Sequence, residues 1–491
     1  MKVIKSKAFI KIIGLLAVIE GLAMIPCAII GCIFHESTST ISFIVLGSVL
    51  FAYGYLIVNH FRNIHFELRT HESYLISCFC WIFCSLIGAL PFYCAGMGYG
   101  LIDSIFESFA GFTTTGCTCF DLDFMPKSLT LWRAISNWLG GMGILVLVCS
   151  ILPALGAGGQ SIASTETTGP NLIKIGGKFS DTGRFLYTIY IGFSVVEFIL
   201  LAISPLNWYD ALVNTLSSVS TGGLLVTTQN EALFSNVYVR LVIIVFTCLS
   251  SMNYTTYFYC LKGNFKAFFS NVEIRVFWII IGSTTILITL DLWLTGTYSS
   301  FIHALKDSMA QVVSFITTSG YFVCEYTNWP TFSVVLLTFL IVLGGCSMST
   351  SGSLKVIRVI ALFKMINRNL FKQVHPQSVK PILIQGKPLA AEKASSITTH
   401  ILLYFAVLLF SILVLSLNGL STETTVTTAL SIFSNTGMAL GEVGSTGFFG
   451  MFNGFSKLYL CLLMLAGRLE VYALIMMFTK SFWQEDKSNT L

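Results

Sequence analysis

Long, nearly uncharged apolar runs recur along the whole chain. The clearest lie near residues 73–95, 183–204, 276–297 and 398–418. A helix needs about 20 apolar residues to cross a bilayer, and an outer-membrane barrel uses alternating strands of roughly ten, so these runs suit helices. Only 10% of the 491 residues are charged, whereas soluble domains carry roughly 25%. The pattern therefore predicts an all-α polytopic membrane protein and excludes a soluble enzyme.

An internal repeat follows two N-terminal apolar runs. The first run reaches about residue 34, too long for a signal peptide, so we expect two transmembrane helices within residues 1–69. The rest divides into four units, each with a long apolar run, a short amphipathic segment and a second long run. We place the units at 70–165, 166–264, 265–394 and 395–491. Their second apolar runs lie near 131–153, 237–260, 332–365 and 456–480.

The short segment of each unit begins at an acidic residue and ends at a glycine. The four segments run from Asp103 to Gly116, Asp210 to Gly222, Asp307 to Gly320 and Glu423 to Gly437. The acidic residue precedes the glycine by 13, 12, 13 and 14 positions, too few to span a bilayer. A carboxylate suits the positive end of a helix, and a glycine permits a turn at the other end. We therefore expect four re-entrant half-helices, each followed by an extended polar stretch.

Four half-helices that stop near the middle of the membrane can form a cation site without a carboxylate in the pore. Their C-termini carry partial negative charge, and their last carbonyls must face water or an ion. The extended stretches would add rings of backbone carbonyls that replace an ion's hydration shell. The candidate cation-binding residues are Thr114, Thr115, Gly116, Ser220, Thr221, Gly222, Thr318, Ser319, Gly320, Asn435, Thr436 and Gly437.

Two further features lie in the second apolar runs of the third and fourth units. Small and polar residues from Gly344 to Ser353 interrupt the run at 332–365. Such a stretch is not a stable helix at membrane depth unless it lines water or protein; the alternative is a helix-packing face. Arg468 is the one basic residue inside an expected span, and its burial requires a partner. Since Glu470 would point elsewhere on a helix, a structural carboxylate partner would come from another span.

Four motifs resemble the TrkH branch of the TrkH/KtrB/HKT potassium transporters over nearly the whole chain. They are Phe112–Gly116, Trp138–Gly143, Gly344–Thr350 leading into Lys355–Arg358, and Gly467–Glu470. The resemblance implies four M1–pore-loop–M2 repeats around a central pore, two additional N-terminal helices, a homodimer and potassium uptake. Potassium is then the substrate, and no cofactor is expected on this chain. In relatives, serine at the first filter position accompanies sodium permeation, so Gly116 favours potassium.

The resemblance also implies a gate. The interrupting stretch becomes an intramembrane gating loop beneath the filter, and Arg468 faces the pore, where it holds the loop's carbonyls or repels ions. The candidate gating residues are Gly344, Gly345, Cys346, Ser347, Ser349, Thr350, Gly352 and Arg468. Met348, Ser351 and Ser353 depart from the usual glycine-richer loop.

A cytoplasmic TrkA-like nucleotide-binding regulatory subunit is implied by the same resemblance. The chain lacks a nucleotide motif of its own, because neither Gly177-Lys178 nor Gly386-Lys387 completes a phosphate-binding loop. Most of the 28 lysine and arginine residues fall in segments expected on the cytoplasmic side. We therefore expect a bacterial inner-membrane protein with both termini in the cytoplasm, lipid around it and no nucleic-acid partner. The expected docking face includes Lys174, Lys178, Lys262, Lys266 and residues 355–393.

A proton- or sodium-coupled secondary cation transporter is the open alternative. Glu20 and Glu197 lie within apolar runs and could couple a proton, although interhelical hydrogen bonding is the simpler role. Such transporters bind at discontinuous helices in two halves, whereas this chain has four short re-entrant segments, which favours a channel-like pore. No clustered histidine, cysteine and carboxylate motif suggests an enzyme.

Overall fold

A computed structural model of the protein describes residues 6–62, 70–143, 179–223, 234–321, 323–444, 447–477 and 479. In these ranges the regular structure is helical except for one two-stranded sheet. Six helical segments are long and apolar enough to cross a membrane: α1, α2, α3 with α4, α9, α15, and α19 with η3. The prediction of an all-α polytopic membrane protein is confirmed.

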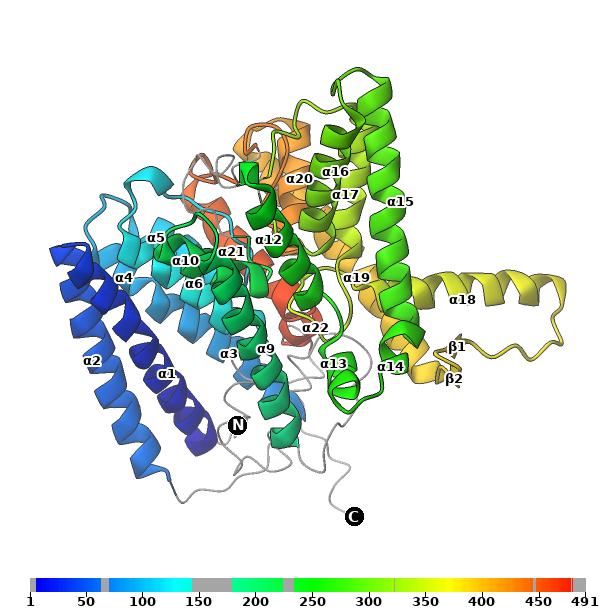
Figure 1. Cartoon of the computed structure of the whole chain (residues 1–491). Coiled ribbons are helices and arrows are strands. Elements are labelled where there is room, and N and C mark those ends of the chain that lie inside the picture. Colours follow the sequence, from blue (N-terminus) through cyan, green and yellow to red (C-terminus); the bar gives the residue numbers. More distant parts are fainter. Residues whose placement is uncertain are drawn as a thin grey trace, which may run out of the picture.

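The N-terminal pair consists of α1 (Ser6–Ile33) and α2 (Ser37–His60), which pack closely at one side of the molecule (Figure 1). Glycines make this contact possible. A Cβ on Gly21 would lie 2.8 Å from the carbonyl oxygen of Gly47, and a Cβ on Gly47 would lie 3.2 Å from that of Gly21. Small residues at a helix contact let two backbones approach within a membrane.

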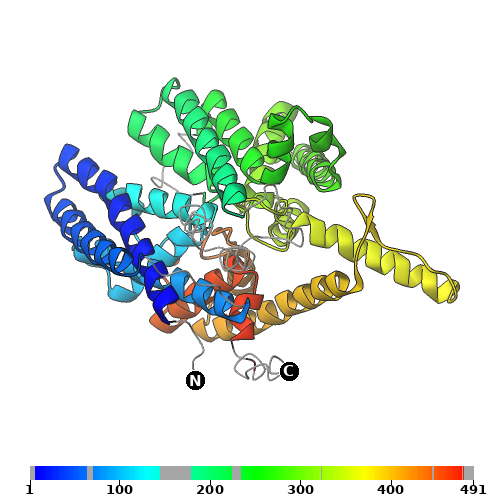
Figure 2. The same cartoon turned by 90° about the horizontal axis from the view of Figure 1, so that it is seen from below.

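The remaining helices follow the same order four times. The first group is α3 (Thr70–Gly88), α4 (Leu90–Cys94), α5 (Leu101–Phe112), η1 (Leu122–Phe124) and α6 (Lys127–Gly141). The second is α9 (Phe179–Ala202), α10 (Trp208–Val219), α12 (Val237–Ser250), α13 (Tyr254–Leu261) and α14 (Lys266–Ser270). The third is α15 (Val272–Leu294), α16 (Phe301–Ile316), α17 (Thr331–Leu343) and α18 (Val356–Val374). The fourth is α19 (Ala391–Leu415), η3 (Ser416–Asn418), α20 (Thr422–Phe433), α21 (Gly454–Arg468) and α22 (Tyr472–Met476). Seen from below, these groups surround a common centre (Figure 2).

The helix after each of the short helices α5, α10, α16 and α20 is shorter than the apolar run that predicted it. Helices α6, α12, α17 and α21 have 15, 14, 13 and 15 residues. The expectation of one continuous second span is wrong at 237–260, where α12 and α13 meet at a 94° bend. A new helix begins there because the Asn253 side chain accepts the N–H of Thr255 and caps α13.

The expected last span, 456–480, is also interrupted. Helix α21 ends at Arg468, because Glu470 and Val471 adopt positive φ angles of 56° and 65°. In the first unit α6 ends at Gly141, and residues 144–153 of the expected run lie outside the described residues. Hydropathy therefore located these segments but did not reveal their breaks.

Helix α18 leaves the body as an arm (Figures 1 and 2). Strands β1 (Leu383–Ile384) and β2 (Lys387–Pro388) follow it and pair antiparallel, with Leu383 opposite Pro388. The arm exposes large apolar side chains, namely Phe363, Ile366, Leu370 and Val374.

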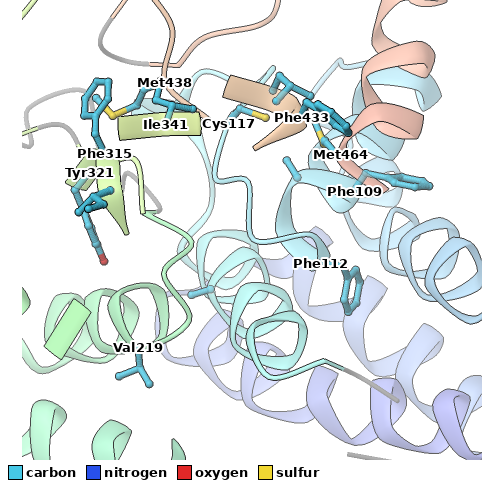
Figure 3. Packing of buried hydrophobic residues seen from close by; sticks show 14 of the residues in the cluster. Phe109, Phe112, Cys117, Val219, Phe315, Tyr321, Ile341, Phe433, Met438 and Met464 are labelled. Atoms are coloured by element: carbon cyan, nitrogen blue, oxygen red, sulfur yellow. The ribbon is translucent and has the colours of Figure 1, made fainter. Parts of the chain in front are cut away.

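The hydrophobic core surrounds the ends of the four short helices α5, α10, α16 and α20 (Figure 3). Phe112, Val219 and Phe433 are fully buried there. Each is the last residue of its short helix, α5, α10 or α20. This packing fixes where the polar segments that follow begin.

Candidate functional site: a fourfold ring above an interrupting loop

The four short helices end in the same way. One residue beyond each helix cap, the chain takes a left-handed turn at a residue other than glycine. These four residues, the floor residues, are Thr114, Thr221, Thr318 and Asn435, with φ angles of 55°, 54°, 56° and 55°. Such angles are unfavourable for side-chain-bearing residues, so the surrounding hydrogen bonds must hold them.

Equivalent hydrogen bonds close each turn. The residue after each floor residue donates its N–H to the carbonyl five residues earlier. The four bonds are Thr115 to Ala110 at 2.9 Å, Gly222 to Ser217 at 2.9 Å, Ser319 to Ser314 at 3.0 Å and Thr436 to Ser431 at 2.9 Å. The chain therefore leaves all four helices along equivalent paths.

A ring of glycines lies two residues beyond the floor residues. Its members, the ring glycines, are Gly116, Gly223, Gly320 and Gly437, with φ angles of 75°, 55°, 65° and 82°. A Cβ on any of them would overlap a backbone carbonyl oxygen of the next unit. The overlaps join Gly116 to Gly222, Gly223 to Ser319, Gly320 to Thr436, and Gly437 to Thr115. The four units thus form a closed cycle in which each glycine packs against its neighbour's backbone.

The ring corrects the register expected for the second unit. The sequence predicts Gly222 as the equivalent of Gly116, but the structural equivalent is Gly223. Gly222 occupies the position of Thr115, Ser319 and Thr436, whose carbonyls the ring glycines contact. The sequence held a signal for this, because Gly223 follows Asp210 by 13 positions, the interval seen in the first and third units.

The structure brings together the twelve residues expected to bind a cation. Ser220 lies at the end of its helix, where its hydroxyl donates to the carbonyl of Ser217 at 3.0 Å. The other members supply floor positions, ring glycines or the carbonyls between them. Gly223 belongs to the same ring, although the sequence does not predict it as a candidate.

The stretch from Gly344 to Lys355 is a loop directly beneath the floor. The hydroxyl of Thr221 donates to that of Thr350 at 3.2 Å, and the N–H of Gly352 donates to the hydroxyl of Thr318 at 2.8 Å. A Cβ on Gly352 would overlap the carbonyl oxygen of Ser434, beside the fourth floor residue. The loop therefore reaches the second, third and fourth units at once.

The break between α12 and α13 holds the loop from the side. The N–H of Cys346 donates to the carbonyl of Ser251 at 2.9 Å, and the N–H of Tyr254 donates to the carbonyl of Met348 at 3.1 Å. Within the loop, Met348 and Ser353 have positive φ angles of 53° and 68°. The residues that depart from a glycine-rich loop thus include two at positions where glycine would be less strained.

Arg468 connects the loop to the first unit. Its guanidinium donates to the carbonyl of Thr350 at 2.8 Å and to those of Gly140 and Gly141 at 2.6 and 2.5 Å. It also reaches the hydroxyl of Thr114 at 3.4 Å, so loop and arginine together contact all four units. The carboxylate of Glu470 instead pairs with Arg358 of α18. The structure therefore places Arg468 between one backbone carbonyl of the loop, that of Thr350, and two at the end of α6.

Charged groups outside the ring hold the units to one another. Lys457 of the fourth unit pairs with Asp103 of the first at 2.6 Å, and Arg240 of the second pairs with Asp307 of the third at 2.5 Å. Asp103, Asp210 and Asp307 all lie 11 positions before their floor residue, whereas Thr424 occupies that position in the fourth unit.

A buried ion pair behind the ring was not foreseen from the sequence. Arg133 pairs with Glu107, and both side chains are almost fully buried. Glu107 also accepts the N–H of Cys119 at 3.0 Å, which fixes the segment beyond Gly116.

The ring offers only uncharged oxygen atoms and the negative ends of four helices. This combination suits a weakly held cation that passes through. In the described part of the chain, no group of three or more histidine, cysteine, aspartate or glutamate residues could hold a metal ion.

Comparison with known proteins agrees with this architecture. The profile of the TrkH family, described as a cation transport protein, matches residues 41–490. The Trk system potassium uptake protein TrkH of Escherichia coli K12 is 31% identical over 483 residues, 98% of this chain and 99% of the relative. That of Halomonas elongata is 30% identical and covers 98% and 99%. The crystal structure of the potassium transporter TrkH from Vibrio parahaemolyticus has a TM-score of 0.88 at 27% identity, covering 98% of this chain and 100% of that one. Because the family profile and these relatives match nearly the whole chain, the chain is a multi-pass membrane protein that belongs to the TrkH family of cation transport proteins.

Proposed function

We propose that this chain forms the potassium-conducting path of an uptake system in a bacterial cytoplasmic membrane. The closed cycle of ring glycines against neighbouring carbonyls carries the proposal, because it gives one axis four equivalent sets of backbone oxygen atoms. The names of the relatives, which are potassium uptake proteins, support the choice of ion.

The repeat boundaries belong to the same proposal. Residues 1–69 would supply the two extra helices, and 70–165, 166–264, 265–394 and 395–491 the four repeats. The order of helices and their common floor geometry support this division.

Gating by the loop is the next element of the proposal. In the conformation described, Thr350 and Gly352 contact the floor residues from below, and Arg468 holds Thr350 in place. An ion leaving the filter would meet this loop, so conduction requires that the loop move. Gly344, Gly345, Cys346, Ser347 and Ser349 would be the part of the loop that moves with Thr350.

A cytoplasmic nucleotide-binding TrkA-like partner would control that movement. Lys262 beyond α13, Lys266 of α14 and the exposed Lys372, Lys380, Lys387 and Lys393 would provide a cationic face for it. Lys355 and Arg358, also expected on this face, are buried and lie outside it. Lys174 and Lys178 lie outside the described residues. A partner can bias a gate only by binding its open and closed states differently.

The α18 arm supports assembly as a homodimer. It extends away from the body and exposes Phe363, Ile366, Leu370 and Val374 along 19 residues. An apolar face of this kind, beyond the chain's own core, suits burial against a second copy or lipid.

Rubidium uptake into proteoliposomes that contain the purified chain tests the conduction proposal. We expect uptake down a rubidium gradient that excess sodium scarcely inhibits and that a pH gradient does not drive. Equal competition by sodium would contradict the filter assignment.

A proton-coupled transporter is the second candidate, and Glu197 is the residue that favours it. It is fully buried in α9 and accepts the hydroxyl of Ser218 at 2.5 Å, behind the short helix of the second unit. Uptake driven by a pH gradient in the native chain and lost in Glu197→Gln would establish coupling.

A further inference from the structure

One end of the intramembrane loop is held by a buried carboxylate. Glu273, the second residue of α15, is 1% exposed. Its Oε1 accepts the N–H of Ser347 at 2.5 Å, and its Oε2 accepts the Ser347 hydroxyl at 2.8 Å. Bonds to a carboxylate are stronger than bonds between neutral groups. Both oxygen atoms are therefore used to fix a single loop residue.

Ser347 is also held from the opposite side. The Nδ2 of Asn253 donates to the Ser347 hydroxyl at 3.3 Å. The Oδ1 of Asn253 caps α13 by accepting the N–H of Thr255 at 2.9 Å. Ser347 thus lies between the starts of two helices, α13 and α15, that belong to different units.

Fixing Ser347 limits the movement of Thr350. Thr350 follows Ser347 by three residues, and three residues extend over at most about 10 Å. Thr350 makes the contacts with Thr221 and Arg468 that place the loop beneath the floor. Besides the bonds from the α12–α13 break, two charged side chains therefore hold the loop, Glu273 at Ser347 and Arg468 at Thr350.

The helix end that carries Glu273 is in contact with the hairpin after α18. Asn271 caps α15 by accepting the N–H of Glu273 at 2.9 Å. Gln385, in the turn between β1 and β2, donates to the same Asn271 oxygen at 3.2 Å. A displacement of the hairpin would thus reach the start of α15.

We propose that Glu273 is a positioning residue that holds the intramembrane loop beneath the filter and links the loop to the start of α15. The inference rests on the proposed function, because the loop must be the gate. Glu273 touches neither the ion path nor the ring glycines, so it acts through Ser347 and sets how often the loop leaves the floor.

The test uses the full chain in proteoliposomes and compares Glu273→Ala with Glu392→Ala. Glu392 is the matched control, because it is likewise the second residue of its helix, α19, but is exposed. We expect Glu273→Ala to raise the maximal rubidium influx about tenfold, as the loss of one or two charge-assisted hydrogen bonds implies. The rubidium concentration at half-maximal influx and the sodium-to-rubidium ratio should not change. Glu392→Ala should behave like the native chain.

Two milder variants keep the proposal testable if Glu273→Ala fails to fold. Ser347→Ala removes the bonds of the hydroxyl to Glu273 and Asn253 but keeps the N–H bond to Glu273, and it should raise influx about threefold. Glu273→Gln keeps an acceptor for the Ser347 N–H and should raise influx less than Glu273→Ala. The double variant Glu273→Ala/Ser347→Ala should raise influx by less than the product of the two single effects, because both changes break the contact between Glu273 and Ser347.

Arg468→Ala, measured in parallel, separates this inference from the gate itself. If Arg468→Ala raises influx while the Glu273 and Ser347 variants leave it unchanged, Glu273 does not position the loop. If none of the variants alters influx, the loop is not a gate. A sodium-to-rubidium ratio that changes together with influx would mean that Glu273 supports the filter, which also overturns the proposal.

Discussion

The two halves of the site differ in symmetry. Above the floor, four units repeat one geometry so closely that the floor residues share φ angles within 54–56°. Below it, each second helix breaks in its own way: α6 ends at a glycine pair, α12 bends, α17 gives way to a loop and α21 ends at an arginine.

Under the proposed function, this difference would separate two physical tasks. An ion without its hydration shell needs equivalent oxygen atoms around the axis, and equal geometry in four units provides them. A gate needs a part that moves relative to a fixed part, so one loop and one arginine suffice. Selectivity and gating should therefore respond to different substitutions, and each prediction below tests that separation.

The largest effect is expected from the ring glycines. Gly116→Ser and Gly223→Ser should each raise the sodium-to-potassium permeability ratio at least about tenfold. A side chain there would add left-handed backbone strain and overlap a carbonyl oxygen, and the two effects together would destabilise the ring by ~2–6 kcal/mol. Ion competition in proteoliposomes measures the ratio.

Gly222→Ser is the control for the register of the ring. A Cβ on Gly222 would meet the side chain of Asn137 at 2.8 Å rather than a backbone carbonyl, and its φ is not positive. Its effect on the ratio should therefore be smaller than that of Gly223→Ser. The reverse order would restore the register expected from the sequence.

A smaller effect, on flux alone, is expected at Arg468. Arg468→Ala should raise potassium flux about tenfold at unchanged selectivity, since the loop loses its one hydrogen bond to the guanidinium, and a bond to a charged group is worth ~1.5–3 kcal/mol. Arg468→Lys, which keeps the charge but not the planar fork of donors, should give an intermediate flux. Protein level is measured beside flux, and a well-folded Arg468→Ala with native flux would remove the arginine from the gate.

The smallest effect is expected at the ion pairs between units. Lys457→Met should lower the free energy of unfolding by ~1 kcal/mol or less, because the pair with Asp103 is partly exposed. Glu423→Gln, at an exposed carboxylate of the fourth unit, should leave thermal stability unchanged. Altered selectivity in Lys457→Met would show that the outer pairs belong to the filter after all.

The sequence predicts the part of the candidate site that repeats in all four units. Four acidic-to-glycine intervals between apolar runs located the floor and three of the four ring glycines, because repetition makes a weak Thr-Gly signal specific. The one-residue error in the second unit arises because Gly222 and Gly223 are adjacent. The interval of 13 positions favours Gly223, but the fourth unit, with 14, does not keep this interval, so the backbone angles decide.

Features that occur once were harder to predict. Arg468 was singled out as a buried charge, but its acceptors Gly140 and Gly141 could not be foreseen, since they depend on where α6 ends. The same holds for Glu273 and Ser347, which are 74 positions apart and meet only because the loop turns back. Hydropathy reports composition and not backbone continuity, so the bend after α12 was also missed.

The cycle of glycine-to-carbonyl contacts is a closed ring whose four parts constrain one another. Each ring glycine is pressed against the next unit, and the fourth closes on the first, so the diameter is a property shared by all four units. A side chain added at one ring glycine must therefore displace all four units. Once one substitution has widened the ring, a second should change the sodium-to-potassium permeability ratio little. The double variant Gly116→Ser/Gly320→Ser should therefore have nearly the same ratio as either single variant.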